Sequence, residues 1–236
     1  MDIVITTFEA RKDILIELIN SIRTYVNNRI ILIINGEKNG IINEDYRRDI
    51  LNICLEHINI VPIFFTELRS LSKMWNIGVI NSTSKNILIL NDDLLWVNNL
   101  IKDIETQLDL INDVKLINHS FSHFIVNKTF MNEIGYFDEK LLGFGWEDSD
   151  FCMRYYEKTG NVIGVIKTTA IKNLNSTIKH KNIRNVWDKY SLINREYYEK
   201  KYEYPLAESY KCGQRFLPNE NPYPLETYYL NNKNNL

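Results

Sequence analysis

Two short acidic stretches contain most of the residues in this sequence that could do chemistry. The first is Asn91-Asp92-Asp93, which ends an apolar run, and the second spans residues 147–150. Carboxylates at the end of a buried strand suit a hard divalent cation such as Mg²⁺ or Mn²⁺, and one or two are enough when substrate phosphate oxygens complete the coordination shell. The first stretch could equally be an acidic turn that caps a helix beginning near residue 97, because Asp-rich turns are common. The residues alone leave both interpretations open.

The second stretch contains Glu147, Asp148 and Asp150 and follows the sequence Gly-Phe-Gly-Trp. We expect a helix to begin here and to stop at Gly160. Carboxylates in the first turn of a helix are stabilised by its N–H groups and its dipole, which is an ordinary role that requires no function. The glycines and aromatic residues before it predict a mobile loop that offers ring faces, as a lid over a sugar would. A carboxylate at such a helix start is also suited to act as a general base toward a hydroxyl group.

Strand and helix patterns alternate in the first part of the chain. Short apolar runs rich in β-branched residues predict buried strands, and apolar residues at helical spacing predict the helices between them. The strands are expected at 2–8, 29–36, 60–65 and 86–91, and the helices at 9–26, 44–58 and 71–82. This order predicts an α/β fold with a Rossmann-like, mostly parallel sheet flanked by helices. Because ligands bind at the carboxyl ends of such strands, residues 6–9, 35–36 and 91–93 are expected on one rim.

The alternation ends after residue 115, beyond which strand-like pieces have no regular period, and one more strand is predicted over 161–166. The residues from about 171 onward are expected to wrap the core. A helix is predicted over 183–202, before a polar tail that is predicted to be disordered. We predict one core domain over residues 1–170 and a C-terminal helical extension over residues 171–236 that packs on it.

Composition limits the class of protein. A net charge of −2 and a pI near 6.1 argue against nucleic acid or an anionic membrane as the general partner. No apolar run approaches the ~18–20 residues that span a bilayer, and the N-terminus lacks the features of a secretory signal. The cysteines Cys54, Cys152 and Cys212 are odd in number and widely spaced, which favours reduced thiols. We expect a cytoplasmic protein; peripheral membrane association and the oligomeric state stay open.

The order of the motifs resembles that of the GT-A glycosyltransferases, particularly the large inverting family 2. The resemblance covers residues 2–170 and rests on VITTF, ING, SLSKMWNIGV, ILILNDD and IGYFDEKLLGFGWEDSDFCMR. The last of these motifs is the most specific, and it also resembles the acceptor-side segment of the β-1,4-galactosyltransferases. The chain beyond residue 170 matches more loosely, through LINREYYEKKY.

The resemblance implies a binding site for a nucleotide-diphosphate sugar. In the family, the loop after the first strand holds the nucleotide, the end of the second strand faces the base, and the chain then passes the pyrophosphate before an Asn-x-Gly helix signature. The matching positions here are Thr6, Thr7, Phe8, Glu9, Asn35, Arg69, Lys73, Asn76 and Asp92. Because the rim has Asn35 rather than a basic cluster, we expect a uridine diphosphate donor.

The resemblance also implies a divalent metal, Mn²⁺ or Mg²⁺. Asn91-Asp92-Asp93 matches the family's Asp-x-Asp motif with Asn in place of the first acid, so Asp93 is the expected main ligand and Asn91 a further one. Family members often have a metal-binding His after the strand that follows the acidic helix. Asn173 stands near that place in this sequence and His180 follows it, so either is a candidate to complete the metal shell.

For catalysis, the resemblance implies that Asp148 is the base, that Glu147 orients donor or acceptor hydroxyl groups, and that Trp146 stacks on a sugar. The expected reaction is the transfer of a sugar from a UDP-sugar to a hydroxyl group of a glycan or other acceptor, with inversion. A catalytically inactive nucleotide- or sugar-binding module is the alternative, because Asn stands at positions 91 and 173. A nucleotidyltransferase is less favoured, because the loop after the first strand lacks a Gly-rich phosphate-binding sequence.

Overall fold

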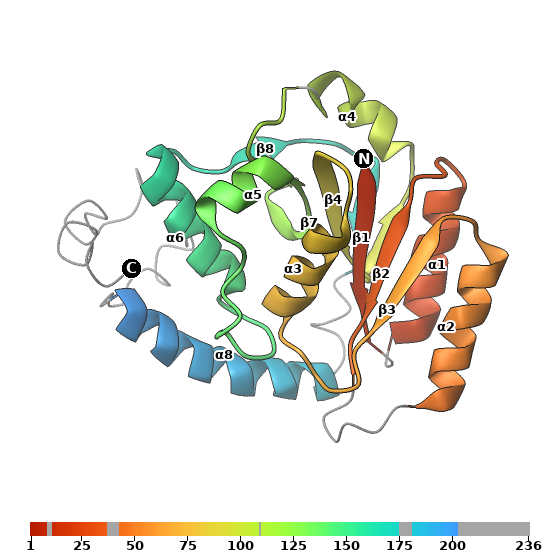
Figure 1. Cartoon of the computed structure of the whole chain (residues 1–236), viewed down its shortest axis with the longest axis horizontal. Coiled ribbons are helices and arrows are strands. Elements are labelled where there is room, and N and C mark those ends of the chain that lie inside the picture. The colour runs from red at the N-terminus through yellow and green to blue at the C-terminus, as the bar shows by residue number, and fades with distance from the viewer. Residues whose placement is uncertain (9–10, 37–42, 109, 175–180, 203–236) are drawn as a thin grey trace.

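The computed structural model describes the chain except for residues 9–10, 37–42, 109, 175–180 and 203–236 (Figure 1). Its centre is a seven-stranded sheet with the strand order β3-β2-β1-β4-β7-β6-β8. The strands of this sheet are β1 (Asp2–Thr7), β2 (Ile30–Ile34), β3 (Ile60–Phe64), β4 (Asn86–Asn91), β6 (Val114–Ile117), β7 (Ser120–Asn127) and β8 (Gly164–Ile166). A second, two-stranded sheet pairs β5 (Leu94–Trp96) with β9 (Ile171–Asn173).

The four strands β3, β2, β1 and β4 are parallel to one another, as the alternating sequence pattern predicts. The helices between them are α1 (Lys12–Arg23), α2 (Glu44–Glu56) and α3 (Leu71–Asn81). α1 and α2 pack on one face of the sheet, whereas α3 packs on the other face with α5 (Lys128–Ile134) and α6 (Glu147–Thr159) (Figure 1). The predicted fold class, a mostly parallel sheet flanked by helices, is confirmed.

The central strands are apolar on both sides because both faces of the sheet are covered. Ile3 and Ile5 of β1 belong to the core under α1 and α2, whereas Val4 belongs to the core under α3. The contact with α3 is close at Gly78, where an added Cβ would lie 2.3 Å from Cγ1 of Val4. A small residue at this position therefore lets α3 approach the strand that leads to the rim.

The structure after Asn91-Asp92-Asp93 contradicts the interpretation that these acids cap a helix beginning near residue 97. A strand, β5, follows the acids directly, and the next helix, α4 (Leu100–Leu108), begins only after it. The capping role is therefore wrong for Asp92 and Asp93, because a strand separates them from the helix. Asn99 supplies the local cap instead, since its Oδ1 accepts a hydrogen bond from the amide of Lys102 at 3.1 Å.

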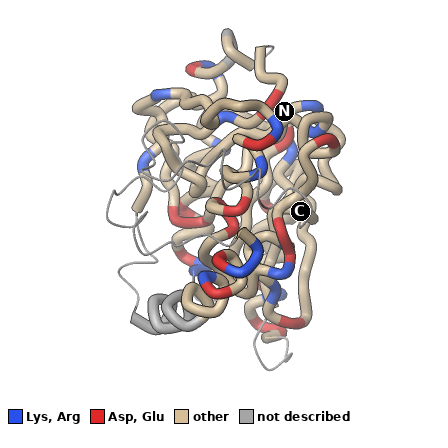
Figure 2. The backbone as a smooth tube through the Cα atoms, turned by 90° about the vertical axis from the view of Figure 1, so that its left-hand side faces the viewer, with Lys and Arg blue, Asp and Glu red and all other residues tan. Residues whose placement is uncertain are grey.

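The helix predicted over 183–202 is present as α8 (Lys181–Tyr202), which lies along α6 and the segment before it (Figure 1). The division of the chain at residue 170 stays a prediction, and the tail lies outside the described residues. No helix in the described part of the chain is long and apolar enough to cross a bilayer. Lys and Arg are interspersed with Asp and Glu along this part of the chain (Figure 2).

Candidate active site

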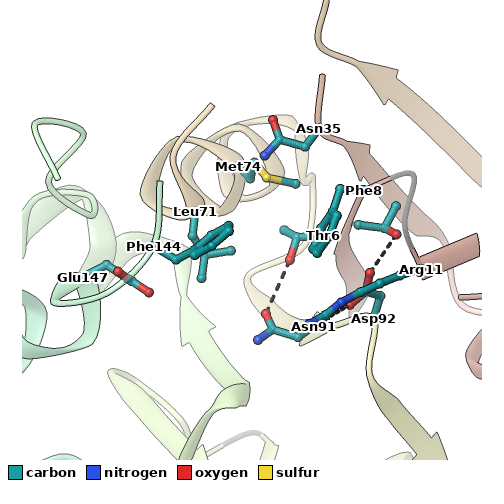
Figure 3. A pocket seen from close by; sticks show the side chains of 11 residues that line it. Thr6, Phe8, Arg11, Asn35, Leu71, Met74, Asn91, Asp92, Phe144 and Glu147 are labelled. Atoms are coloured by element: carbon teal, nitrogen blue, oxygen red, sulfur yellow. Dashed lines mark hydrogen bonds and ion pairs between the residues drawn. The ribbon is translucent and has the colours of Figure 1, made fainter. Parts of the chain in front are cut away.

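A pocket of about 170 Å³ opens on the rim where β1, β2 and β4 end (Figure 3). The strand ends and the loop after β1 form one wall. The start of α3, the segment before α6 and the first residue of α6 form the other. The lining residues are Thr6, Thr7, Phe8, Arg11, Asn35, Leu71, Met74, Asn91, Asp92, Phe144 and Glu147. Most of them are predicted from the sequence; Arg11, Leu71, Met74 and Phe144 are not.

Asp92 anchors the strand wall of the pocket. Its buried carboxylate accepts hydrogen bonds from the Thr7 hydroxyl (Oγ1 to Oδ2, 2.8 Å) and from the Arg11 guanidinium (Nη1 to Oδ1, 2.5 Å). Burial raises the pKa of Asp92 to about 6, although the charge and the hydrogen bond of Arg11 favour the ionised form. Each carboxylate oxygen of Asp92 thus accepts a hydrogen bond within the protein, which fixes this acid to Thr7 and Arg11, while Asp92 also lines the pocket.

Asp93, the second acid of the pair, is buried and is not among the residues that line the pocket. Its Oδ1 forms an ion pair with Nη1 of Arg11 at 3.7 Å, and its backbone carbonyl accepts a hydrogen bond from the amide of Leu174 at 2.9 Å. No group of three or more His, Cys, Asp or Glu residues among the described ones is placed to hold a metal ion. One carboxylate and an amide oxygen nevertheless fit Mg²⁺ or Mn²⁺, provided that substrate phosphate oxygens and water complete the shell. His180 and Glu9, both predicted site residues, lie outside the described residues.

Arg11 is the residue of the strand wall that no sequence motif indicates. It precedes the first residue of α1 and is only 4% exposed, and its guanidinium lies over the ring of Phe8 at 4.8 Å as well as against Asp92. A cation at the N-terminal end of a helix is opposed by the helix dipole, so its position there signals a compensating acid elsewhere. That signal is weak without knowledge of the fold, because the acid is in the distant β4 segment.

Replacing Arg11 with Met is expected to lower the free energy of unfolding by about 3 kcal/mol, because removing one partner of a buried ion pair leaves an uncompensated charge. Urea denaturation measures the change. Lys12→Met is the matched control, since Lys12 forms an exposed pair with Asp49 at 2.7 Å, and such pairs contribute about 0–1 kcal/mol. Equal losses in the two variants would contradict the anchoring role of Arg11.

Asn35 lies at the end of β2, as predicted, but its side-chain amide is engaged by the protein backbone. Nδ2 donates to the carbonyl of Arg69 at 2.9 Å, and Oδ1 accepts from the amides of Arg69 (2.8 Å) and Gly36 (3.0 Å). Asn35 therefore joins the β2 end to the segment before α3 and shapes the pocket at this corner. The Arg69 side chain is exposed and pairs with Glu67 at 3.1 Å rather than lining the pocket.

Lys73 and Asn76, two further predicted donor-site residues, also lie away from the pocket lining. Lys73 pairs with Glu139 at 2.7 Å. Asn76 is buried, donates to the carbonyl of Phe137 (2.9 Å) and to Oε1 of Glu139 (3.0 Å), and accepts from the amide of Phe137 (2.9 Å). In this structure both residues hold α3 against the segment after α5.

The three acids of the second stretch occupy the first turn of α6, as predicted, but have different surroundings. Glu147 lines the pocket, and its Oε2 accepts from the amide of Gly145 at 2.6 Å. Asp148 is half-buried outside the pocket lining, and its Oδ1 accepts from the amide (2.8 Å) and hydroxyl (3.3 Å) of Ser149. Asp150 is fully buried against α8. The divergence follows from the ~100° rotation between successive helix residues.

Trp146, the predicted sugar-stacking residue, is only 3% exposed in the structure. Its backbone is left-handed (φ +77°), its Nε1 donates to the carbonyl of Ser191 at 2.8 Å, and its ring packs on Tyr198 of α8 at 5.5 Å. The aromatic ring of this segment that lines the pocket is that of Phe144 (Figure 3). Trp146 is not among the lining residues, and its contact with a sugar stays a prediction.

Replacing Asp150 with Asn is expected to lower the free energy of unfolding by roughly 2–3 kcal/mol, because charge-assisted hydrogen bonds are lost from a buried site. The carboxylate accepts from Nε of Arg154 (2.9 Å), Nζ of Lys201 (2.5 Å) and the hydroxyl of Tyr202 (2.7 Å). Thermal unfolding followed by circular dichroism measures the effect. Glu199→Gln, which removes a partly exposed pair on α8, is the control. A loss no larger than that of the control would contradict the anchoring of α8 through Asp150.

Residues 72–200, more than half of the chain, match the family described as glycosyltransferase like family 2. The chain therefore belongs to this family. No curated protein sequence matches it significantly. This membership, together with the rim pocket, agrees with the resemblance of the sequence motifs to the family 2 glycosyltransferases.

Several solved structures share the fold at low sequence identity. TarS residues 1–349 from S. aureus, in complex with UDP, has 16% identity and a TM-score of 0.56 over 72% of this chain and 59% of that one. The mannosyltransferase PcManGT from Pyrobaculum calidifontis, in complex with GDP-Man and Mn²⁺, has 11% identity and a TM-score of 0.55 over 71% and 54%. In another structure of S. aureus TarS, the match covers only 36% of the TarS chain. This chain thus spans between a third and three fifths of these relatives, and the likeness shows a GT-A fold.

Proposed function

We propose that the chain is an inverting glycosyltransferase that moves a sugar from a nucleotide-diphosphate sugar, with a UDP-sugar favoured, to a hydroxyl group of a glycan or other acceptor. The rim pocket is the observation that supports this most, because Asn91 and Asp92 line its strand wall, with the buried Asp93 directly after them, and Glu147 lines its opposite wall. Family membership supports the reaction class. The relatives whose structures contain UDP, UDP-GlcNAc or GDP-Man support the class of donor.

In this proposal the strand wall binds the donor. The loop after β1, with Thr6, Thr7 and Phe8, holds the nucleotide, and the buried Arg11–Asp92 pair keeps that loop in register with the end of β4. Asp93, with Asn91, would hold Mn²⁺ or Mg²⁺. When bound, such an ion acts as a Lewis acid that offsets negative charge on the leaving diphosphate.

The transfer step needs a base on the acceptor side of the pocket. We assign this role to Asp148, which removes the proton from the acceptor hydroxyl group. The acceptor oxygen then bonds to the anomeric carbon on the face opposite the diphosphate, the bond from that carbon to the diphosphate oxygen breaks, and UDP leaves. Glu147, held by the amide of Gly145, orients hydroxyl groups of the donor or acceptor. Placement of the reactants and a positioned base account for most of the rate in such a mechanism.

Calorimetry with UDP, GDP and CMP in the presence of Mn²⁺ tests the donor assignment. We expect UDP to bind most tightly, because the residues that the structure describes at the β2 corner of the pocket include Asn35 and no basic cluster. UDP-GlcNAc then serves as a turnover probe, with release of UDP as the signal. Tighter binding of CMP than of UDP would contradict the diphosphate assignment.

A nucleotide-binding module without catalytic activity is the second candidate. It is favoured by Asn91, which replaces an acid, and by the engagement of both Asp92 oxygens with Arg11 and Thr7. UDP binding without release of UDP from any UDP-sugar, in the presence of a broad panel of hydroxyl acceptors, would support this candidate over the enzyme.

A further inference from the structure

The segment from Leu141 to Trp146, here called the acceptor-side loop, has an unusual backbone. Gly143, Gly145 and Trp146 have φ values of +55°, +105° and +77°. Left-handed backbone is costly for a non-glycine residue and persists only when the surrounding structure enforces it. The loop is therefore expected to require support from outside itself.

Helix α8 supplies that support through Asn194. This side chain is only 1% exposed and makes three hydrogen bonds to the backbone of the loop. Its Nδ2 donates to the carbonyls of Leu142 (2.7 Å) and Gly145 (2.8 Å), and its Oδ1 accepts from the amide of Leu142 (2.7 Å). A single buried amide thus satisfies both ends of the loop.

Two neighbouring residues of α8 extend the same contact. The carbonyl of Ser191 accepts from Nε1 of Trp146 at 2.8 Å, and the ring of Tyr190 lies against Gly143, where an added Cβ would be 2.4 Å from its Cδ2. Residues 190, 191 and 194 of α8 therefore contact most of the acceptor-side loop.

The supported loop determines one wall of the pocket. Phe144 belongs to it, and the amide of Gly145 holds the carboxylate of Glu147 at 2.6 Å. The carbonyl of Gly143 accepts from the amide of Leu71 at 2.7 Å, so the loop also meets the start of α3. A shift of the loop would therefore move the pocket-lining side chains of Phe144, Glu147 and Leu71 together.

We propose that Asn194 is a positioning residue for the transfer reaction, acting through the acceptor-side loop on Phe144 and Glu147. This inference rests on the proposed function. It assigns to α8 a role beyond covering the core, since the contact of Asn194 with the loop is separate from the contact of Tyr202 with Asp150 at the C-terminal end of the helix. Loss of either contact would loosen α8, but only loss of the Asn194 contact should alter the pocket wall.

The test compares Asn194→Ala and Asn194→Asp with Tyr202→Phe. Ala at position 194 removes all three hydrogen bonds to the loop. Asp keeps the acceptor for the Leu142 amide but places a carboxylate against two carbonyls. Both Asn194 variants should therefore speed hydrogen exchange of the Leu142 amide, whereas Tyr202→Phe should not. UDP-GlcNAc hydrolysis should fall about 10²-fold in the Asn194 variants, as a small misplacement of catalytic groups can cause, with UDP affinity unchanged. Tyr202→Phe should retain hydrolysis.

Two results would overturn the inference: unchanged Leu142 exchange in the Asn194 variants, or hydrolysis that does not distinguish them from Tyr202→Phe. If the Asn194 variants do not fold, Trp146→Phe is the second variant. It removes the hydrogen bond to Ser191 and part of the packing on Tyr198, so it should speed exchange in the loop and lower hydrolysis. Wild-type values for both would reject the proposal. A wild-type protein that neither binds UDP nor hydrolyses UDP-GlcNAc would reject the proposed function, while the exchange comparison still decides whether Asn194 supports the loop.

Discussion

Replacing Asp93 with Ala is expected to abolish the Mn²⁺-dependent stabilisation of the protein by UDP. A ligand at about 100 times its Kd stabilises the folded state by about 2.7 kcal/mol. For a chain of this size, that corresponds to a rise in Tm of roughly 5–10 °C. Asp93 is the last acid of Asn91-Asp92-Asp93 and directly follows β4, the place at which the sequence motif predicts the metal ligand. Thermal unfolding with UDP, with and without Mn²⁺, measures the loss.

The control for this experiment is Asp103→Ala on α4. Asp103 is an exposed acid that accepts from the hydroxyl of Thr168 at 2.7 Å and does not line the pocket. That variant should keep the full Mn²⁺-dependent rise in Tm. The rise in Tm is measured for each variant against its own unliganded protein, because removal of the buried Asp93 carboxylate is expected to lower the Tm by itself. A full Mn²⁺-dependent rise in the Asp93 variant would show that Asp93 is not the metal ligand.

The parallel half of the sheet could be predicted because its pattern is local. Each strand from β1 to β4 is a short apolar run, and each is followed by a helix or by the acids, so the rim follows from strand order alone. The other half could not be predicted to the same extent. β8 lies within the strand predicted over 161–166, but β5 and β9 contain three residues each, too few for an alternation to be recognised. β5 also pairs with β9 from a distant part of the chain.

Within the site, the limits of prediction have the same physical origin. Arg11 has a function only in relation to Asp92, and the two meet because β1 pairs with β4. The motif Gly-Phe-Gly-Trp indicates a loop with two rings but not which ring faces the pocket. That depends on the left-handed backbone of Trp146, which α8 stabilises from nearly fifty residues further along the chain. Motifs locate the acids, whereas their roles depend on long-range contacts.

Replacing Asp148 with Asn is expected to lower turnover by the ~10²–10⁴-fold typical of a lost general base. The substitution keeps the shape of the side chain, and its amide oxygen can still accept from the amide of Ser149, as Oδ1 of Asp148 does at 2.8 Å. The amide of Asn cannot take up the proton of the hydroxyl group to which the sugar is transferred. UDP affinity should change little, because the donor is assigned to the opposite wall. Steady-state turnover of a UDP-sugar with its acceptor, together with calorimetry, separates the two effects.

The neighbouring acids provide the controls, because each has a different environment. Asp150→Asn should lower stability more than rate, since its three partners are Arg154, Lys201 and Tyr202 rather than groups of the pocket. Glu147 lines the pocket, and its carboxylate is held by the amide of Gly145, so Glu147→Gln should weaken substrate orientation and leave a residual rate above that of Asp148→Asn. If Glu147→Gln were instead the variant with the larger loss, and Asp148→Asn turned over normally, the base would be Glu147. Near-normal turnover in both variants would mean that the two carboxylates only stabilise the start of α6.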